Sequence, residues 1–174
     1  MDTTIRRAAA GDAHDIAHIH VVAWQTTYRG IVPQPFLDSL DEDSRAEDWN
    51  TWLQNPEVPT YIAERDGRLC GFISGGKLRE PMGHYDAELY AIYLLPSGKG
   101  DGIGKLLTQR LAEALIAQAF RSMAVWVLAD NPARNFYAHL GAQQIAEKTI
   151  RIGDAELLEV AYGWQDLRAL TTSA

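Results

Sequence analysis

Apolar residues recur along the chain with two different spacings, which predict a mixture of helices and strands. Intervals of three and four residues place Ile16, Ile19 and Ala23 on one face of a helix, and residues 103–120 repeat this pattern. A further helical stretch runs through Trp49. Short apolar runs bounded by turn residues predict strands near residue 4, on both sides of Asp66-Gly67, and at 88–95, 122–130, 142–152 and 156–164.

The order of these segments predicts the architecture. Asp66-Gly67 is a dipeptide that a type I′ turn prefers, so residues 60–76 are expected to form a hairpin. The strand that ends before Pro96, the helix after it and the next strand form a crossover unit. Its two strands are expected to be parallel neighbours whose carboxyl ends part where a ligand can enter. Residues 25–36 are expected to be a loop, and the predicted fold class is α+β with a mixed sheet in one domain, 1–174.

The segment "GKGDGIGK", residues 98–105, carries glycine at every second position between a predicted strand and a predicted helix. Glycine costs about 0.5–1 kcal/mol relative to alanine in regular structure, so this alternation indicates a special loop that something approaches closely. The first N–H groups of a helix lack internal partners and form an anion site, most naturally for phosphate. The alternative is a plain connector.

Two well-known phosphate loops do not fit this segment. The Walker pattern fails because Lys99 and Leu106 stand where it requires a glycine and a hydroxyl residue. The dinucleotide pattern fails because Ile103 and Lys105 stand where its last glycine is required. A phosphate site of another kind is therefore predicted.

Charge and composition narrow the choice of partners. The net charge of -7 argues against nucleic acid as a partner, and no apolar run approaches the roughly 20 residues that cross a bilayer. The start lacks the apolar core of a signal peptide, so a cytoplasmic protein that does not bind membranes is expected. Cys70 is expected to be a buried strand residue, and His14 and His18 lack a third ligand, so no metal site is predicted.

The chain resembles the GCN5-related N-acetyltransferase superfamily over nearly its whole length. The acetyl-CoA signature of that superfamily is [QR]-x-x-G-x-[GA] after a strand that ends in proline, and "LLPSGKGDGIGK" is similar, with Gly102 and Gly104 at the glycine places. Lys99 stands at the Gln/Arg place, which keeps the charge but lacks a planar fork. "DNPARNFYAHLGA" resembles another family segment, with Asn131 one residue nearer the tyrosine than in many members. Residues 23–40 are similar to a large group of bacterial members.

The resemblance implies a mostly antiparallel sheet that splays at a central parallel strand pair and is flanked by helices. It also implies acetyl-CoA as co-substrate, without a metal. The pyrophosphate would bind amides of the glycine loop, and the pantetheine arm would lie beside the preceding strand like an added strand. The implied acetyl-CoA-binding residues are Ile92, Tyr93, Leu94, Lys99, Gly100, Asp101, Gly102, Ile103, Gly104, Lys105 and Asn131.

The activity that the resemblance implies is acyl transfer, from acetyl-CoA to a primary amine of a small molecule by direct attack. Such an attack needs a base, and Glu88 is the candidate because it begins the central strand, where family members often place a carboxylate. Its alternative is an exposed strand-end glutamate. Tyr137, in the "FY" position, is the candidate acid that protonates the departing thiolate; its alternative is a core tyrosine.

Other outcomes remain open from the sequence. One alternative is a module of the same fold that binds acyl-CoA without catalysis, as a regulatory subunit. Another is an enzyme that transfers a longer acyl group or acts on a protein amino terminus. The resemblance also implies a homodimer, with a face formed by Trp126 and the closing strands.

Overall fold

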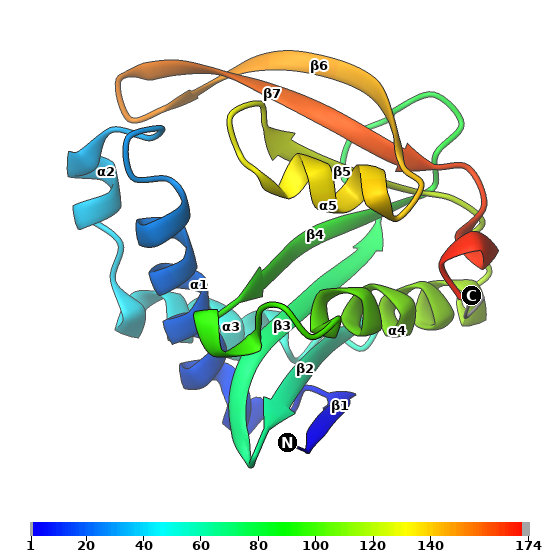
Figure 1. Cartoon of the computed structure of the whole chain (residues 1–174), viewed down its shortest axis with the longest axis horizontal. Helices are drawn as coiled ribbons and strands as arrows, with labels where there is room; N and C mark the ends of the chain where they lie inside the picture. Colours follow the sequence, from blue (N-terminus) through cyan, green and yellow to red (C-terminus); the bar gives the residue numbers. More distant parts are fainter. Residues whose placement is uncertain (1, 172–174) are drawn as a thin grey trace.

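Seven strands form one sheet in the order β1-β2-β3-β4-β5-β7-β6 in the computed structural model, which describes residues 2–171 (Figure 1). The strands are β1 (Thr3–Arg7), β2 (Thr60–Arg65), β3 (Arg68–Lys77), β4 (Ala87–Leu94), β5 (Met123–Leu128), β6 (Gln143–Ile152) and β7 (Ala155–Trp164). The helices are α1 (Ala13–Thr27), α2 (Gln34–Asp38), α3 (Glu42–Trp52), α4 (Ile103–Ala117) and α5 (Ala133–His139), with short 3-10 turns at Ala10–Asp12, Pro96–Gly98 and Leu167–Leu170.

The sheet is mixed, and the predicted α+β fold class is confirmed. Every neighbouring pair of strands is antiparallel except β4 and β5, which are parallel. The predicted hairpin joins β2 to β3 through Asp66 and Gly67, whose φ angles of 52° and 80° are the positive values of a type I′ turn.

The parallel pair parts soon after it begins. β4 and β5 pair only through Ala87 with Met123 and Glu88 with Ala124. Beyond these residues β4 continues to Leu94 without a partner on that side, and Figure 1 shows the carboxyl ends of the two strands diverging. The predicted opening between the strands is confirmed.

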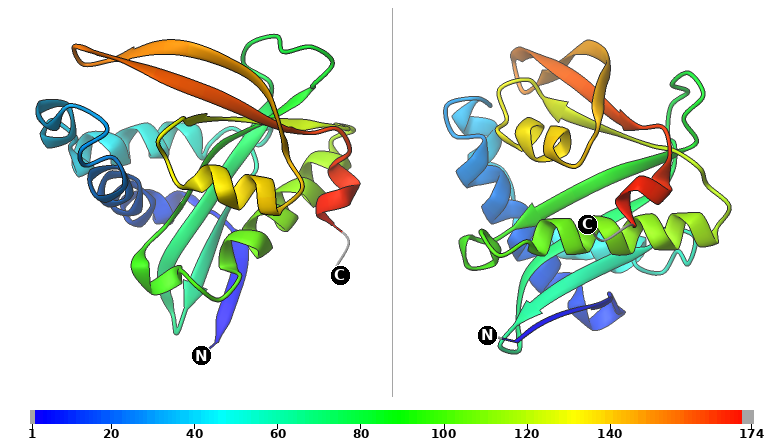
Figure 2. Two further views of the ribbon diagram at one scale, coloured as in Figure 1. Left: turned by 45° about the horizontal axis from the view of Figure 1, so that its top comes forward. Right: turned by 45° about the vertical axis from the view of Figure 1, so that its right-hand side comes forward.

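Helices cover both faces of the sheet (Figure 2). On one face α4 and α5 pack in a core with side chains from β3, β4, β5 and β7, and Leu107 and Leu111 of α4 are fully buried. On the other face α1 and α3 pack against Phe72 of β3. Burial of these amphipathic faces holds the ends of the helices beside the opening between β4 and β5.

The segment at residues 25–36 differs from the prediction. α1 extends through Thr27, and α2 begins at Gln34 rather than after a long loop. The prolines at 33 and 35 do not prevent this helix, because proline is tolerated at the cap and in the first turn, where its missing N–H has no intrahelical partner to lose.

Candidate active site

The free edge of β4 forms one wall of the candidate site. Ile92, Tyr93 and Leu94 lie beyond the last residue that pairs with β5, and each is half-buried. Their backbone therefore has no strand neighbour on the side of the opening. An extended chain of amides can bind such an edge as an added strand, which is the placement predicted for these three residues.

The loop after β4 presents a row of open backbone amides. No N–H from Gly100 to Lys105 donates to a protein acceptor within residues 2–171, and the first bond of α4 runs from Leu106 N to Gly102 O at 3.0 Å. These six amides stand at the N-terminus of a helix of 15 residues, where the macrodipole adds a partial positive charge. The loop is therefore equipped to bind an anion with several oxygens.

The four glycines of the loop have two different causes. A Cβ on Gly98 would lie 2.9 Å from the carbonyl oxygen of Cys70, and one on Gly104 would lie 3.1 Å from the Phe136 ring. Packing inside the protein therefore accounts for these two. Gly100 and Gly102 instead have φ angles of 93° and 75°, which other residues rarely adopt.

The side chains of the loop contribute unequally. Lys99 and Lys105 are exposed, so their charges can reach an anion, whereas Ile103 is 1% exposed and packs into the core. Ile103 can therefore contribute only its amide. The Asp101 carboxylate accepts a hydrogen bond from Arg65 Nη2 at 2.6 Å.

Tyr137 lies on α5 and is 5% exposed, with its ring 6.1 Å from that of Trp164 and 6.4 Å from that of Tyr162. Burial, with a smaller effect from nearby Tyr28, raises the pKa of Tyr137, so the hydroxyl stays protonated at neutral pH. No residue among those described accepts or donates a hydrogen bond at this hydroxyl. Tyr137 is thus a core residue, as the alternative interpretation holds. Its hydroxyl proton is not used in a hydrogen bond to another described residue and can be donated to a ligand.

Two more tyrosines border the same opening. Trp24 Nε1 donates to the Tyr93 hydroxyl at 2.8 Å, and Asn131 Nδ2 donates to the Tyr28 hydroxyl at 2.9 Å. Both hydroxyls act as acceptors in these bonds, and burial raises the pKa of each, so both keep a proton to donate. The roles of Trp24 and Tyr28 were not predicted, although their spacing of four residues on one helical face was a signal.

Asn131, predicted to contact acetyl-CoA, uses both ends of its amide within the protein. Besides the bond to Tyr28, its Oδ1 accepts a hydrogen bond at 2.9 Å from the backbone N of Ala133, the first residue of α5. Through this bond Asn131 positions the helix that carries Tyr137. A contact with the co-substrate remains a prediction.

Glu88 is 2% exposed, so the alternative interpretation, an exposed glutamate at the end of a strand, is wrong. Its carboxylate accepts three hydrogen bonds from Arg79, from the backbone N at 3.1 Å and from Nε and Nη2 at 3.2 and 2.5 Å. Glu88 pairs with Ala124, whereas the next residue, Val125, belongs to the core that contains Tyr137. Because successive strand residues face opposite ways, Glu88 and Tyr137 lie on opposite faces of the sheet.

A second carboxylate, which the sequence reasoning missed, lies on the same face as Glu88. Glu159 of β7 pairs with Leu128 of β5, an even number of residues from Ala124. Burial raises the pKa of Glu159, and the charge of Glu88 adds to this effect, while Lys148 and Arg79 oppose it. A charged residue inside the apolar run 156–164 was the available signal.

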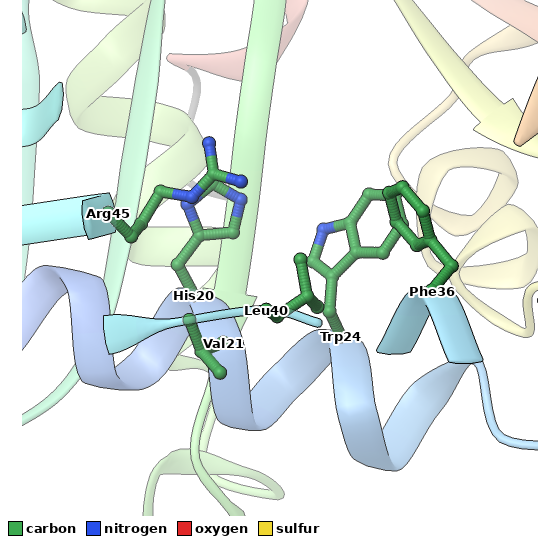
Figure 3. A pocket seen from close by; sticks show the side chains of 6 residues that line it. All are labelled: His20, Val21, Trp24, Phe36, Leu40 and Arg45. Carbon is green, nitrogen blue, oxygen red and sulfur yellow. The ribbon is translucent and has the colours of Figure 1, made fainter. Parts of the chain in front are cut away.

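A small cavity of about 140 Å³ lies between α1, α2 and α3 (Figure 3). Trp24 and Phe36 lie together at one end and His20 and Arg45 at the other, with Val21 and Leu40 completing the lining. The His20 ring stacks on Tyr93 of β4, at 5.2 Å between ring centroids, so the cavity adjoins the candidate site. Burial, and then the charge of Arg45, lower the pKa of His20 to about 4.

In the part of the chain that the structure describes, no three His, Cys, Asp or Glu side chains are grouped so as to hold a metal ion. No helix between residues 2 and 171 combines the length and apolarity needed to traverse a bilayer.

Comparison with known proteins agrees with this geometry. The model of the acetyltransferase (GNAT) family matches residues 22–142. The uncharacterized N-acetyltransferase YuaI of Bacillus subtilis (strain 168) is 38% identical over 170 residues, which cover 97% of this chain and 96% of that protein. Mycothiol acetyltransferase of Thermomonospora curvata is 32% identical, over 60% of this chain and 34% of that protein.

Solved structures share the fold. PaiA N-acetyltransferase from Thermoplasma acidophilum, in complex with coenzyme A, has a TM-score of 0.69 at 20% identity, covering 92% of this chain and 98% of that chain. The structure of yncA from Salmonella typhimurium with its cofactor acetyl-CoA has a TM-score of 0.73 at 24% identity, covering 100% and 97%.

The low pKa of His20 predicts how stability depends on pH. In the unfolded chain a histidine has a pKa near 6.5. As the pH falls from 6.5 toward 4, the unfolded state therefore binds a proton at this residue, whereas the folded state does not. This histidine alone should then lower the free energy of unfolding by up to about 3 kcal/mol between pH 7 and pH 4. Urea unfolding at several pH values measures the effect.

Two variants isolate His20 in that experiment. His20→Asn keeps an acceptor for Trp49 Nε1, which donates to His20 Nδ1 at 3.2 Å, and should lose less stability on acidification than the parent protein. His14→Asn, at an exposed position of the same helix, should follow the parent. Parallel pH dependence for the parent protein and His20→Asn would contradict the assignment.

Proposed function

The chain belongs to the acetyltransferase (GNAT) family, and we propose that it transfers acetyl from acetyl-CoA to a primary amine of a small molecule by direct attack. One observation carries the choice of donor: the free edge of β4 leads through Pro96 directly into the six open amides of residues 100–105. A ligand that joins a diphosphate to an extended arm of amides matches these two features in order.

The residues present fit acetyl-CoA. The amides from Gly100 to Lys105 would hold the diphosphate, with the exposed charges of Lys99 and Lys105 beside it. The backbone of residues 92–94 would hold the arm. When bound, acetyl-CoA supplies a thioester, whose carbonyl is the electrophile.

The direction of the arm supports Glu88 as the base. An arm held at the diphosphate loop, beyond the carboxyl end of β4, runs back along the strand toward the end where β4 and β5 still pair. Glu88 belongs to the last of these pairs and lies on the face opposite to α4 and α5. An amine that approaches from this face would give its proton to Glu88, with Arg79 holding the carboxylate in place.

Tyr137 is suited to the opposite task. Its pKa is raised, so it holds its proton at neutral pH, and the proton has no acceptor within residues 2–171. Since Tyr137 belongs to the core on the α4 and α5 side, a proton given there would reach the departing thiolate from the side opposite to the amine. Base and acid thus act from the two faces of the sheet.

The cavity between α1, α2 and α3 supports a small acceptor. Its volume of about 140 Å³ is below the roughly 300 Å³ at which pockets for drug-sized ligands begin. It can hold one small apolar or aromatic group beside Trp24 and Phe36. A protein amino terminus as acceptor and a longer acyl group are the alternatives. A homodimer through Trp126, a cytoplasmic location and a lack of nucleic-acid or membrane partners remain predictions.

Tyr137→Phe tests the acid. We expect kcat to fall by about a hundredfold or more, because a general acid contributes factors of that order, while affinity for coenzyme A changes little. Thiol release from acetyl-CoA, screened over polyamines, aminoglycosides, amino acids and peptides, measures turnover. Tyr162→Phe is the matched control, since Tyr162 lies in the same ring cluster and its hydroxyl is bound by Arg134 Nε.

The same screen separates the competing readings. If Tyr28→Phe abolishes turnover and Tyr137→Phe does not, the acid is Tyr28. A parent protein that binds coenzyme A but releases no thiol with any amine would favour a non-catalytic acyl-CoA module.

Glu88→Gln tests the base. The variant should lower kcat/KM about a hundredfold, because the amide cannot accept the proton. Glu159→Gln, on the same face, should lower it much less. If only Glu159→Gln lowers it a hundredfold, Glu159 is the base and the assignment to Glu88 is wrong.

A further inference from the structure

One acidic side chain stands inside the loop to which we assign the diphosphate. Asp101 lies between Gly100 and Gly102, and its own amide is one of the six open N–H groups. A free carboxylate at this position would repel phosphate and weaken the charges of Lys99 and Lys105. The function of the loop therefore depends on where the Asp101 carboxylate is directed.

Arg65 binds this carboxylate. Arg65 is the last residue of β2, and its side chain is 11% exposed, against 57% for that of Asp101. Nη2 of Arg65 donates to Asp101 Oδ2 at 2.6 Å, and Nη1 donates to the carbonyl oxygen of Ser97 at 2.7 Å. One guanidinium thus binds the loop on both sides of Gly98 and Gly100, from a strand two places away in the sheet.

The burial of Arg65 indicates more than surface pairing. Its Nε is buried and has no hydrogen-bond partner among the described residues; no other buried side-chain nitrogen or oxygen among them lacks one. An unsatisfied buried donor lowers the stability of the fold, so its presence needs an explanation. The explanation lies in the two terminal nitrogens, whose bonds to Ser97 and Asp101 hold the conformation of the loop.

We propose that Arg65 is a positioning residue for the diphosphate of acetyl-CoA, which it does not itself touch. It neutralises Asp101, holds that carboxylate away from the amides and fixes the Ser97 carbonyl, so that the N–H groups of residues 100–105 stay directed at the ligand. This inference rests on the proposed function of the loop. Arg65 carries a planar fork, which Lys99 lacks, and both of its bonds go to the loop.

The fork is the property that matters. Ser97 O and Asp101 Oδ2 are bound by two different nitrogens of one rigid group. A lysine carries the same charge at a single point and cannot reproduce both bonds in that geometry. Arg65→Lys should therefore keep the charge and lose part of the affinity.

Calorimetry with coenzyme A and with pantetheine, which lacks the diphosphate, tests the proposal. Arg65→Ala should weaken coenzyme A binding about tenfold or more and leave pantetheine binding unchanged, with a smaller loss in Arg65→Lys. In the double variant Arg65→Ala with Asp101→Asn most of the affinity should return, because no unpaired carboxylate remains. A purely structural role would weaken both ligands and would not be rescued.

Each result bears on a different statement. If the parent protein does not bind coenzyme A, the proposed function fails and this inference fails with it. If the parent binds and Arg65→Ala binds equally well, the inference alone is overturned. Should Arg65→Ala not fold, Arg65→Lys decides, and affinity equal to that of the parent would overturn the role of the fork.

Discussion

The candidate site depends on one constraint in the sheet, which is that hydrogen bonding between β4 and β5 stops after Glu88 and Ala124. Continued pairing would have used the backbone groups on that side of Ile92, Tyr93 and Leu94 and would have filled the space between the strands. Leaving a strand edge open inside a sheet is costly, because backbone polar groups need partners. The protein keeps this edge open where the crossover from β4 to α4 also brings a helix N-terminus to the end of the same strand.

Side chains tie the elements around this opening to one another. Trp24 of α1 reaches Tyr93 of β4, and Asn131 before α5 reaches Tyr28 at the end of α1. These bonds fix the helices relative to the diverging strands without closing the gap. The result is an opening with distinct sides: carboxylates and the small cavity on the α1 face, and Tyr137 on the α4 and α5 face.

Local sequence patterns predicted what local forces determine. The hairpin at Asp66-Gly67 follows from backbone preferences of two residues, and the crossover unit follows from apolar spacing and strand twist. The glycine loop was recognisable because it lies in one continuous stretch. The reason for a glycine at position 104 could not be recognised in this way, because its contact with Phe136 appears only in the folded chain.

Contacts distant in sequence explain the features that were missed. Arg65 and Asp101 are 36 residues apart, and Asn131 and Tyr28 are 103 apart, so no spacing rule joins them. Glu88 shows the same limit: its position at the start of a strand was predicted, whereas its burial and its bonds to Arg79, in the connection before it, were not. Charge pairs of this kind have no periodic signature and arise from the tertiary fold.

The distribution of unsatisfied polar groups gives an independent argument for the location of the site. Folded proteins satisfy nearly all buried donors and acceptors, so an exception needs an explanation. The buried exception among the described side chains, Arg65 Nε, belongs to the residue that binds the loop, and the open amides of residues 100–105, the free edge of β4 and the Tyr137 hydroxyl border the same opening. A polar, extended ligand can form hydrogen bonds with these open groups, whereas the other buried side-chain nitrogens and oxygens within residues 2–171 already have partners.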